Sequence, residues 1–168
     1  TEKQKRVVSK YFERFHGLPI RDFDNYIITA GGQQAMAAAL RSLKPGTDVF
    51  LSNWEYPPIF SILKDNGCNP IRISCDNLTP KVEELKEKVT ENSVFYMSMP
   101  NNPTGFLSPD ILGDIVEIIV DNGGGVIWDA PYLFTMLRLN EYKAEFSDKF
   151  LKKQIEAFKK TTEKYYEN

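Results

Sequence analysis

Hydrophobic positions along the first 129 residues follow two spacings, and each spacing predicts a different kind of element. Apolar residues recur every three or four positions, as in helices, over 3–16, 33–43, 57–66, 79–89 and 108–122. Short apolar or alternating runs, which are typical of strands, occupy 26–29, 49–52, 69–74, 93–99 and 126–129. Because strands and helices alternate, we expect an α/β fold with a mainly parallel sheet flanked by helices.

Two of the predicted helices begin with a hydroxyl residue followed by proline. Thr79 precedes Pro80, and Ser108 precedes Pro109. A hydroxyl at the N-cap accepts a hydrogen bond from a free backbone N–H of the first turn, and proline fits that turn because it has no N–H. We therefore expect Thr79 and Ser108 to be N-caps.

Beyond residue 136 the pattern becomes a charged helical stretch. Aromatic residues recur there roughly one or two helical turns apart, at Phe146, Phe150, Phe158 and Tyr165. Lysines lie between them, as on a solvated helix face. The sequence therefore divides into an α/β unit, residues 1–136, and a C-terminal helical segment, residues 137–168.

Composition excludes several classes of protein. Hydrophobic residues make up 42% of the 168 positions and charged residues 26%, which is typical of a soluble domain and not of a disordered chain. With 21 basic and 23 acidic residues, the chain has no field that attracts nucleic acid. No apolar run is long enough to span a membrane. Cys68 and Cys75 have no zinc-site spacing, so we expect no metal and two free thiols in a reducing cytoplasm.

Polar and glycine residues follow several predicted strands, at the sheet edge where α/β proteins bind ligands. Gly32 and Gln33 open a helix whose N-terminus suits a phosphate, although a plain tight turn has the same sequence. Tyr56 could stack on a planar ring or simply pack in its loop. The Asn102 side chain has an amide that can hydrogen-bond a ligand. Asp129 either caps a helix or supplies a carboxylate that binds a cationic ring nitrogen. Their occurrence in order along one sheet favours a cofactor site.

Four segments carry a resemblance to a known family. Ala30–Ala35, Pro45–Asp48, Asn102–Gly105 and Trp128–Tyr132 match the class I/II aminotransferases of fold type I in order and spacing. The resemblance covers roughly residues 1–135. It implies that residues 1–136 form part of the pyridoxal 5′-phosphate-binding large domain of an aspartate aminotransferase-like enzyme. The C-terminal segment then resembles, more loosely, the helix that enters the small domain.

The resemblance also implies a role for each candidate residue. The amides of Gly32 and Gln33 hold the cofactor phosphate, and Tyr56 lies against the pyridine ring. Asn102 and Tyr132 bind the phenolic oxygen. Asp129 pairs with the pyridinium nitrogen, so that the ring accepts electrons when an amino acid loses its α-proton.

The family further implies a cytoplasmic transferase of amino-acid metabolism. It would be a homodimer that exchanges an amino group between an amino acid and a 2-oxo acid, without nucleic-acid or membrane partners. A pyridoxal phosphate-dependent C–S β-lyase, which needs the same cofactor contacts, is the alternative.

One family feature is not evident in this sequence. The lysine that forms the Schiff base with the cofactor has no recognisable Ser-x-Ser-Lys segment, and the substrate-binding arginine has no motif either. Lys149 in Ser147-Asp148-Lys149 is the nearest candidate.

Three interpretations follow from that departure. The chain is part of a longer aminotransferase, with segments absent around 135–138 and before residue 1; or it is a shortened, non-catalytic scaffold; or it uses an unrecognised lysine. We expect the 168-residue chain alone to be inactive.

Overall fold

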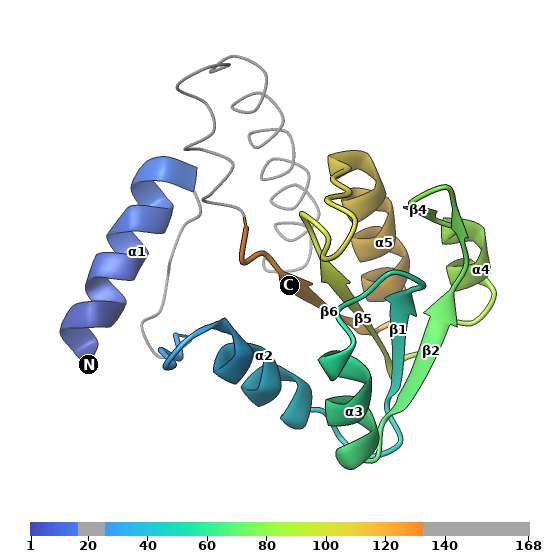
Figure 1. Cartoon of the computed structure of the whole chain (residues 1–168), viewed down its shortest axis with the longest axis horizontal. Helices are drawn as coiled ribbons and strands as arrows, with labels where there is room; N and C mark the ends of the chain where they lie inside the picture. Colours follow the sequence, from blue (N-terminus) through green and yellow to red (C-terminus); the bar gives the residue numbers. More distant parts are fainter. Residues whose placement is uncertain (17–25, 133–168) are drawn as a thin grey trace.

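The computed structural model describes residues 1–16 and 26–132, and a parallel sheet forms the centre of this part of the chain (Figure 1). Its strands are β1 (Asp48–Ser52), β2 (Asn69–Ile73), β5 (Ser93–Ser98) and β6 (Gly125–Asp129). They lie in the order β2-β1-β5-β6, and each neighbouring pair is parallel. The predicted α/β fold with a mainly parallel sheet is confirmed.

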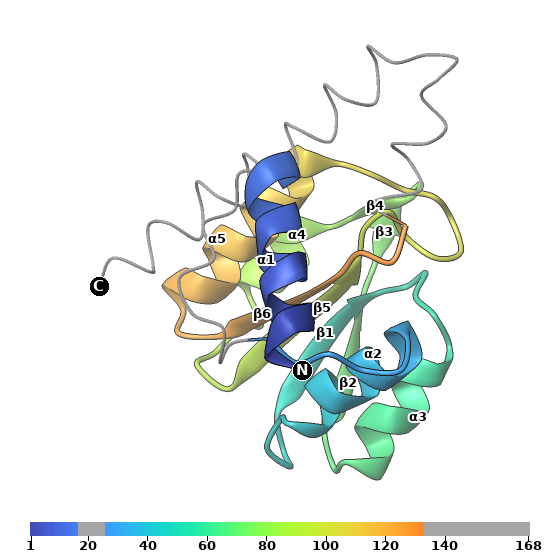
Figure 2. The same cartoon turned by 90° about the vertical axis from the view of Figure 1, so that its left-hand side faces the viewer.

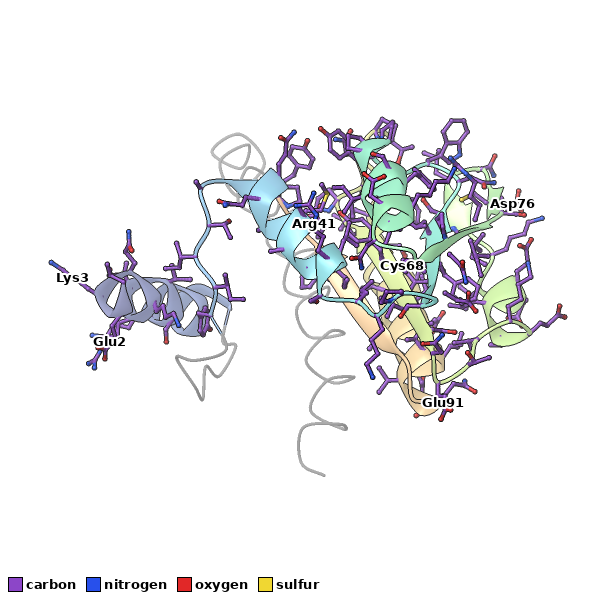
Figure 3. All side chains as sticks on the ribbon, turned by 90° about the horizontal axis from the view of Figure 1, so that it is seen from below. Glu2, Lys3, Arg41, Cys68, Asp76 and Glu91 are labelled. Atoms are coloured by element: carbon purple, nitrogen blue, oxygen red, sulfur yellow. The ribbon has the colours of Figure 1, made fainter. Side chains whose placement is uncertain are left out.

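Helices cover both faces of the sheet. They are α2 (Gly32–Arg41) and α3 (Pro58–Asp65) on one face, and α4 (Val82–Lys86) and α5 (Pro109–Asp121) on the other. The first helix, α1 (Glu2–His16), is separate from these layers (Figures 1 and 3), and in the view of Figure 2 it lies in front of them. Glu2 and Lys3 accordingly lie far from the sheet (Figure 3).

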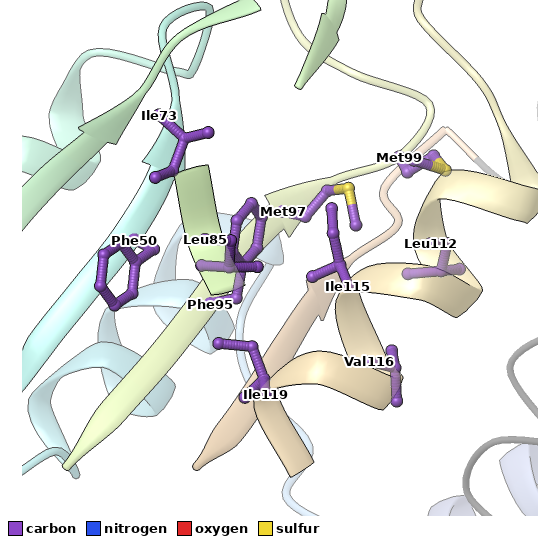
Figure 4. Packing of buried hydrophobic residues seen from close by; sticks show 10 residues of the cluster. All are labelled: Phe50, Ile73, Leu85, Phe95, Met97, Met99, Leu112, Ile115, Val116 and Ile119. Atoms are coloured by element: carbon purple, nitrogen blue, oxygen red, sulfur yellow. The ribbon is translucent and has the colours of Figure 1, made fainter. Parts of the chain in front are cut away.

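Alternation along the strands divides the core into two clusters. Successive side chains of a strand point to opposite faces, so Phe95 and Met97 of β5 face α4 and α5, while Tyr96 between them faces α2 and α3. The first cluster, on the α5 side, comprises Phe50, Ile73, Leu85, Phe95, Met97, Met99, Leu112, Ile115, Val116 and Ile119 (Figure 4). The second comprises Met36, Leu40, Val49, Leu51, Ile59, Leu63, Cys68 and Tyr96. The two central strands, β1 and β5, are buried on both faces, which explains why their sequences read as apolar runs.

The connection from α5 to β6 requires glycine for steric reasons. A Cβ atom on Gly124 would lie 2.5 Å from the Ser93 carbonyl oxygen and 3.0 Å from a methyl carbon of Ile119. The backbone of this turn therefore passes directly against β5, and the neighbouring Gly123 has a φ of 80°. This close approach brings β6 beside β5 and determines where Asp129 ends the strand.

Two sequence predictions about local structure are wrong. Residues 26–29 form no strand, and Ile27 is 80% exposed; within residues 1–16 and 26–132, no strand lies beside them to complete a ladder. Thr79 is not an N-cap: Thr79–Pro80 form the short strand β4, which pairs antiparallel with β3 (Cys75–Asp76). The helix that follows covers only Val82–Lys86, with Lys81 as its N-cap.

Two further local predictions, the N-cap at Ser108 and the free cysteines, are confirmed. The Ser108 hydroxyl accepts a hydrogen bond from the Ile111 N–H at 3.4 Å and so caps α5. Both cysteines are free thiols; Cys68 is buried in the core, whereas Cys75 is partly exposed.

Within the described ranges, no helix has both the length and the hydropathy needed to cross a bilayer. The segment 137–168, including Lys149, lies outside the described residues.

Candidate functional site

The strand order places a ligand-binding position beside β1. From β1 the chain moves outward to β2, and then returns across β1 to form β5 and β6 on its other side. At such a reversal the loops that leave two neighbouring parallel strands diverge, and the gap between them is where open α/β sheets bind ligands. The residues after β1, β5 and β6 all lie at this carboxyl edge.

A pocket of about 370 Å³ occupies this edge. The residues that line it are Gly32, Gln33, Met36, Tyr56, Ser98, Asn102, Asp129, Pro131 and Tyr132. All six residues predicted from the sequence as cofactor-binding are among them. The volume lies within the range of roughly 300–1,000 Å³ that is usual for small-molecule sites. Segments separated by 100 residues of sequence therefore meet in one concave site.

The N-terminus of α2 forms one wall of the pocket. The first bond within the helix runs from the Ala35 N–H to the Gly31 carbonyl, so the N–H groups of Gly32 and Gln33 precede the helical ladder. Gly31 has a φ of 107°, a backbone conformation that favours glycine. The Ala30 N–H donates to the Gln34 side chain at 2.7 Å, which orders the entry to the helix. Free N–H groups and the positive end of the helix dipole suit an anion here.

Two hydrogen bonds join side chains that line the pocket. The Gln33 amide donates to the Tyr56 hydroxyl at 3.0 Å, which links the start of α2 to the loop after β1. The Asn102 amide donates to the Tyr132 hydroxyl at 3.4 Å, which links the turns after β5 and β6. These pairs arrange an aromatic ring, an amide and a phenol around the same space.

Asp129 ends β6 and faces the pocket floor. The Tyr96 hydroxyl, from the neighbouring strand β5, donates to Asp129 Oδ2 at 2.5 Å. Tyr96 is fully buried, and its burial together with the adjacent Asp129 carboxylate raises the pKa of the phenol, so Tyr96 stays a neutral donor. The Tyr96 hydroxyl therefore fixes one carboxylate oxygen of Asp129, and the carboxylate presents its negative charge to a ligand in the pocket.

The two asparagines that follow β5 have different positions. Asn101 is buried: its amide nitrogen donates to the Trp54 carbonyl at 2.8 Å, and its side-chain oxygen accepts from the Thr104 hydroxyl at 2.6 Å. Asn102 faces the pocket, and its backbone N–H donates to Ser98 Oγ at 3.2 Å. Asn101 thus stabilises the turn, while Asn102 is available to a ligand.

Glu55 is a buried carboxyl that the sequence reasoning missed. Only 5% of it is exposed, and within residues 1–16 and 26–132 no basic side chain forms an ion pair with it. Its partners are Ser98 and Asn101, more than 40 positions away in sequence. The signal for it was weak: one acid between Trp54 and Tyr56, directly after a buried strand.

Burial raises the pKa of Glu55 from 4.5 to about 7, and the charge of Asp129 adds to the increase, while hydrogen bonds from Ser98 and the Tyr56 N–H oppose it. Since the folded chain binds this proton more tightly, the free energy of unfolding should fall between about pH 4.5 and pH 7. At about 1.4 kcal/mol per pKa unit, the loss from this group is about 3 kcal/mol. Urea denaturation across this pH range measures it. In Glu55→Gln this part of the pH dependence should disappear; an unchanged pH dependence would contradict the assignment.

Comparison with known proteins identifies the family of the chain. The family model for aminotransferase class I and II matches residues 2–155, further than the roughly 1–135 expected from the motifs. A search of curated proteins found no match.

Solved aminotransferases share the fold. An aspartate aminotransferase mutant from Thermus thermophilus superposes with a TM-score of 0.71 at 20% identity, covering 77% of this chain and 37% of that one. Alanine aminotransferase from Pyrococcus furiosus gives 0.70 at 23% identity, over 76% and 34%. N-succinyldiaminopimelate aminotransferase from Mycobacterium tuberculosis gives 0.69 at 25% identity, over 76% and 35%.

This chain therefore spans about a third of the length of these solved aminotransferases. Its parallel sheet and flanking helices match the large domain of fold type I. With a family match over most of its length, the chain belongs to the class I and II aminotransferases.

Proposed function

We propose that these residues form the cofactor pocket of a pyridoxal 5′-phosphate-dependent aminotransferase, which exchanges an amino group between an amino acid and a 2-oxo acid. The convergence of Gly32, Gln33, Tyr56, Asn102, Asp129 and Tyr132 in one pocket carries this proposal. No two of the four segments that supply them are adjacent in sequence, so the shared pocket is a consequence of the fold.

The groups present fit the cofactor chemically. A dianionic phosphate suits the N–H groups of Gly32 and Gln33, which precede the α2 ladder. A phenolate oxygen suits donors such as the Asn102 amide and the Tyr132 hydroxyl. The ring of Tyr56 supplies an aromatic surface, and the Asp129 carboxylate suits a protonated pyridine nitrogen. Each end of the cofactor therefore has a complementary group.

When bound, the cofactor supplies an electron sink that stabilises the negative charge left when an α-proton is removed. The role of Asp129 is to keep the ring nitrogen protonated, because a carboxylate beside that nitrogen favours its charged form. Tyr96 keeps the Asp129 carboxylate oriented by its hydrogen bond to Oδ2. Asn102 and Tyr132 would bind the phenolic oxygen and so restrict rotation of the ring in the pocket.

The whole enzyme's properties belong to the proposal as well. We infer a cytoplasmic homodimer acting on small amino and 2-oxo acids. The lysine that bonds to the cofactor is unassigned; Lys149 is the nearest candidate from the sequence and lies outside the described residues.

An assay of the native protein with pyridoxal 5′-phosphate and a panel of amino acids tests the reaction class. We expect amino transfer that requires an added 2-oxo acid and releases no ammonia. Release of pyruvate and ammonia from sulfur amino acids would instead favour the β-lyase. Cofactor binding without either reaction would favour a non-catalytic scaffold.

A further inference from the structure

We propose that Glu55 is a positioning residue of this site: its buried carboxylate orients the Ser98 hydroxyl, and through that hydroxyl holds Asn102 in the pocket wall. None of the cofactor contacts described above uses Glu55. The inference deepens the proposed function and rests on it, because Asn102 would bind the cofactor's phenolic oxygen.

The contacts of Glu55 are directed at the turn after β5. Oε1 accepts a hydrogen bond from the Ser98 N–H at 3.0 Å. It also lies 3.2 Å from the Asn101 amide nitrogen, whose two protons are shared among Glu55 and the nearer Trp54 carbonyl and Ser98 hydroxyl oxygens. Oε2 accepts from the Ser98 hydroxyl at 2.8 Å and from the Tyr56 N–H at 3.3 Å. Both oxygens are thus engaged by donors, and the loop after β1 is joined to the end of β5.

The Ser98 hydroxyl transmits this arrangement to the pocket. Its oxygen accepts from the Asn101 amide at 2.9 Å and from the Asn102 N–H at 3.2 Å, which uses both of its lone pairs. Its single proton is then left for Glu55, which can accept it because an ionised carboxylate is an acceptor only. The carboxylate therefore fixes the direction of the Ser98 hydroxyl proton, which leaves both lone pairs of Ser98 Oγ for the two N–H donors.

Protonation of Glu55 would disturb these hydrogen bonds at Ser98. A proton on Oε2 would point at Ser98 Oγ, which would then face three donors with two lone pairs, so one contact must lengthen. The titratable groups that interact with Glu55 or adjoin it are Asp129 of β6, Tyr96 of β5 and the neighbouring Tyr56. Burial, with a smaller contribution from the Asp129 charge, raises the pKa of Glu55 to about 7, within the range of a binding experiment.

The test measures how tightly the full chain binds pyridoxamine 5′-phosphate, by calorimetry from pH 5.5 to 8.5. This probe has no aldehyde and forms no adducts with surface lysines. Wild type is compared with Glu55→Gln, with Ser98→Ala and with the exposed control Glu87→Gln. The probe's own titration is common to all variants, so the ratio of variant to wild-type Kd isolates the protein's contribution to the pH dependence.

We expect Glu55→Gln to bind about tenfold more weakly at pH 8, a loss of one charge-assisted bond, and nearly as well as wild type at pH 5.5. Ser98→Ala should bind the probe similarly weakly at pH 8. The double variant that combines Glu55→Gln with Ser98→Ala should bind no more weakly than the weaker of the two single variants. Glu87→Gln should match wild type throughout. Melting temperatures of the ligand-free proteins establish that each variant is folded.

Three results would overturn the inference. A Kd ratio that stays constant with pH would mean that Glu55 only supports the fold. Unchanged affinity in Ser98→Ala would exclude the hydroxyl relay even if Glu55→Gln fails to fold. Absence of binding by wild type would refute the proposed function itself, a failure that is distinct from the other two.

Discussion

Asp129→Asn is expected to weaken pyridoxamine 5′-phosphate binding at least thirtyfold. Truncating one partner of a buried, hydrogen-bonded charge pair costs roughly 2–5 kcal/mol, or about 30- to several thousand-fold in Kd. The amide keeps an oxygen that can accept from the Tyr96 hydroxyl, so the pocket should retain its shape while losing its charge. Calorimetric titration at pH 8 measures the change, and turnover should fall by several orders of magnitude in the native enzyme.

A matched control for this variant is Asp114→Asn. Asp114 is exposed on α5 and does not line the pocket, so the same loss of charge there should leave the Kd unchanged. Equal affinities for Asp129→Asn and wild type would remove Asp129 from the site. Equal losses in both variants would show that only the net charge of the chain matters.

Phe95→Ala should produce the largest loss of stability, roughly 3–5 kcal/mol in the free energy of unfolding. Phe95 is 1% exposed, in the strand that pairs with both β1 and β6, and it packs in the cluster beneath α5. Truncation would leave a cavity that the two neighbouring strands cannot close without breaking their ladders. Urea denaturation monitored by circular dichroism measures the effect.

Phe60→Ala provides the comparison. Phe60 is half-buried on α3, where the Arg72 guanidinium lies 4.1 Å from its ring centroid. Its removal opens no enclosed cavity, so the loss should be well below that of Phe95→Ala. A Phe95 variant no less stable than the Phe60 variant would contradict the placement of the core.

Much of the site could be predicted because strand ends and sequence motifs coincide. Asp129 follows an apolar run of β-branched and aromatic residues, and Asn102 follows another, so the parallel sheet necessarily brings them to one edge. Gly32 and Gln33 were also identified correctly as a helix start, although the strand expected before them does not exist. The apolar run at 26–29 has the composition of a strand, but no strand in the described part of the chain pairs with it.

The rest depends on contacts between distant segments. Glu55 meets Ser98 across 43 positions and Tyr96 meets Asp129 across 33, and neither pair has a local pattern. In the sequence, Tyr96 is indistinguishable from any other apolar residue of a buried strand, so its hydrogen bond to Asp129 cannot be predicted from the pattern. Thr79-Pro80 has the composition of a helix start, but pairing with Cys75–Asp76 takes those residues into a hairpin.

Calorimetric titration of the full chain with pyridoxamine 5′-phosphate, and in parallel with pyridoxamine, tests the cofactor pocket most directly. The two probes differ only in the phosphate that the α2 N-terminus is proposed to bind. We predict one saturable site per chain for the phosphorylated probe and much weaker binding of pyridoxamine. No saturable binding, or equal binding of both probes, would contradict the account.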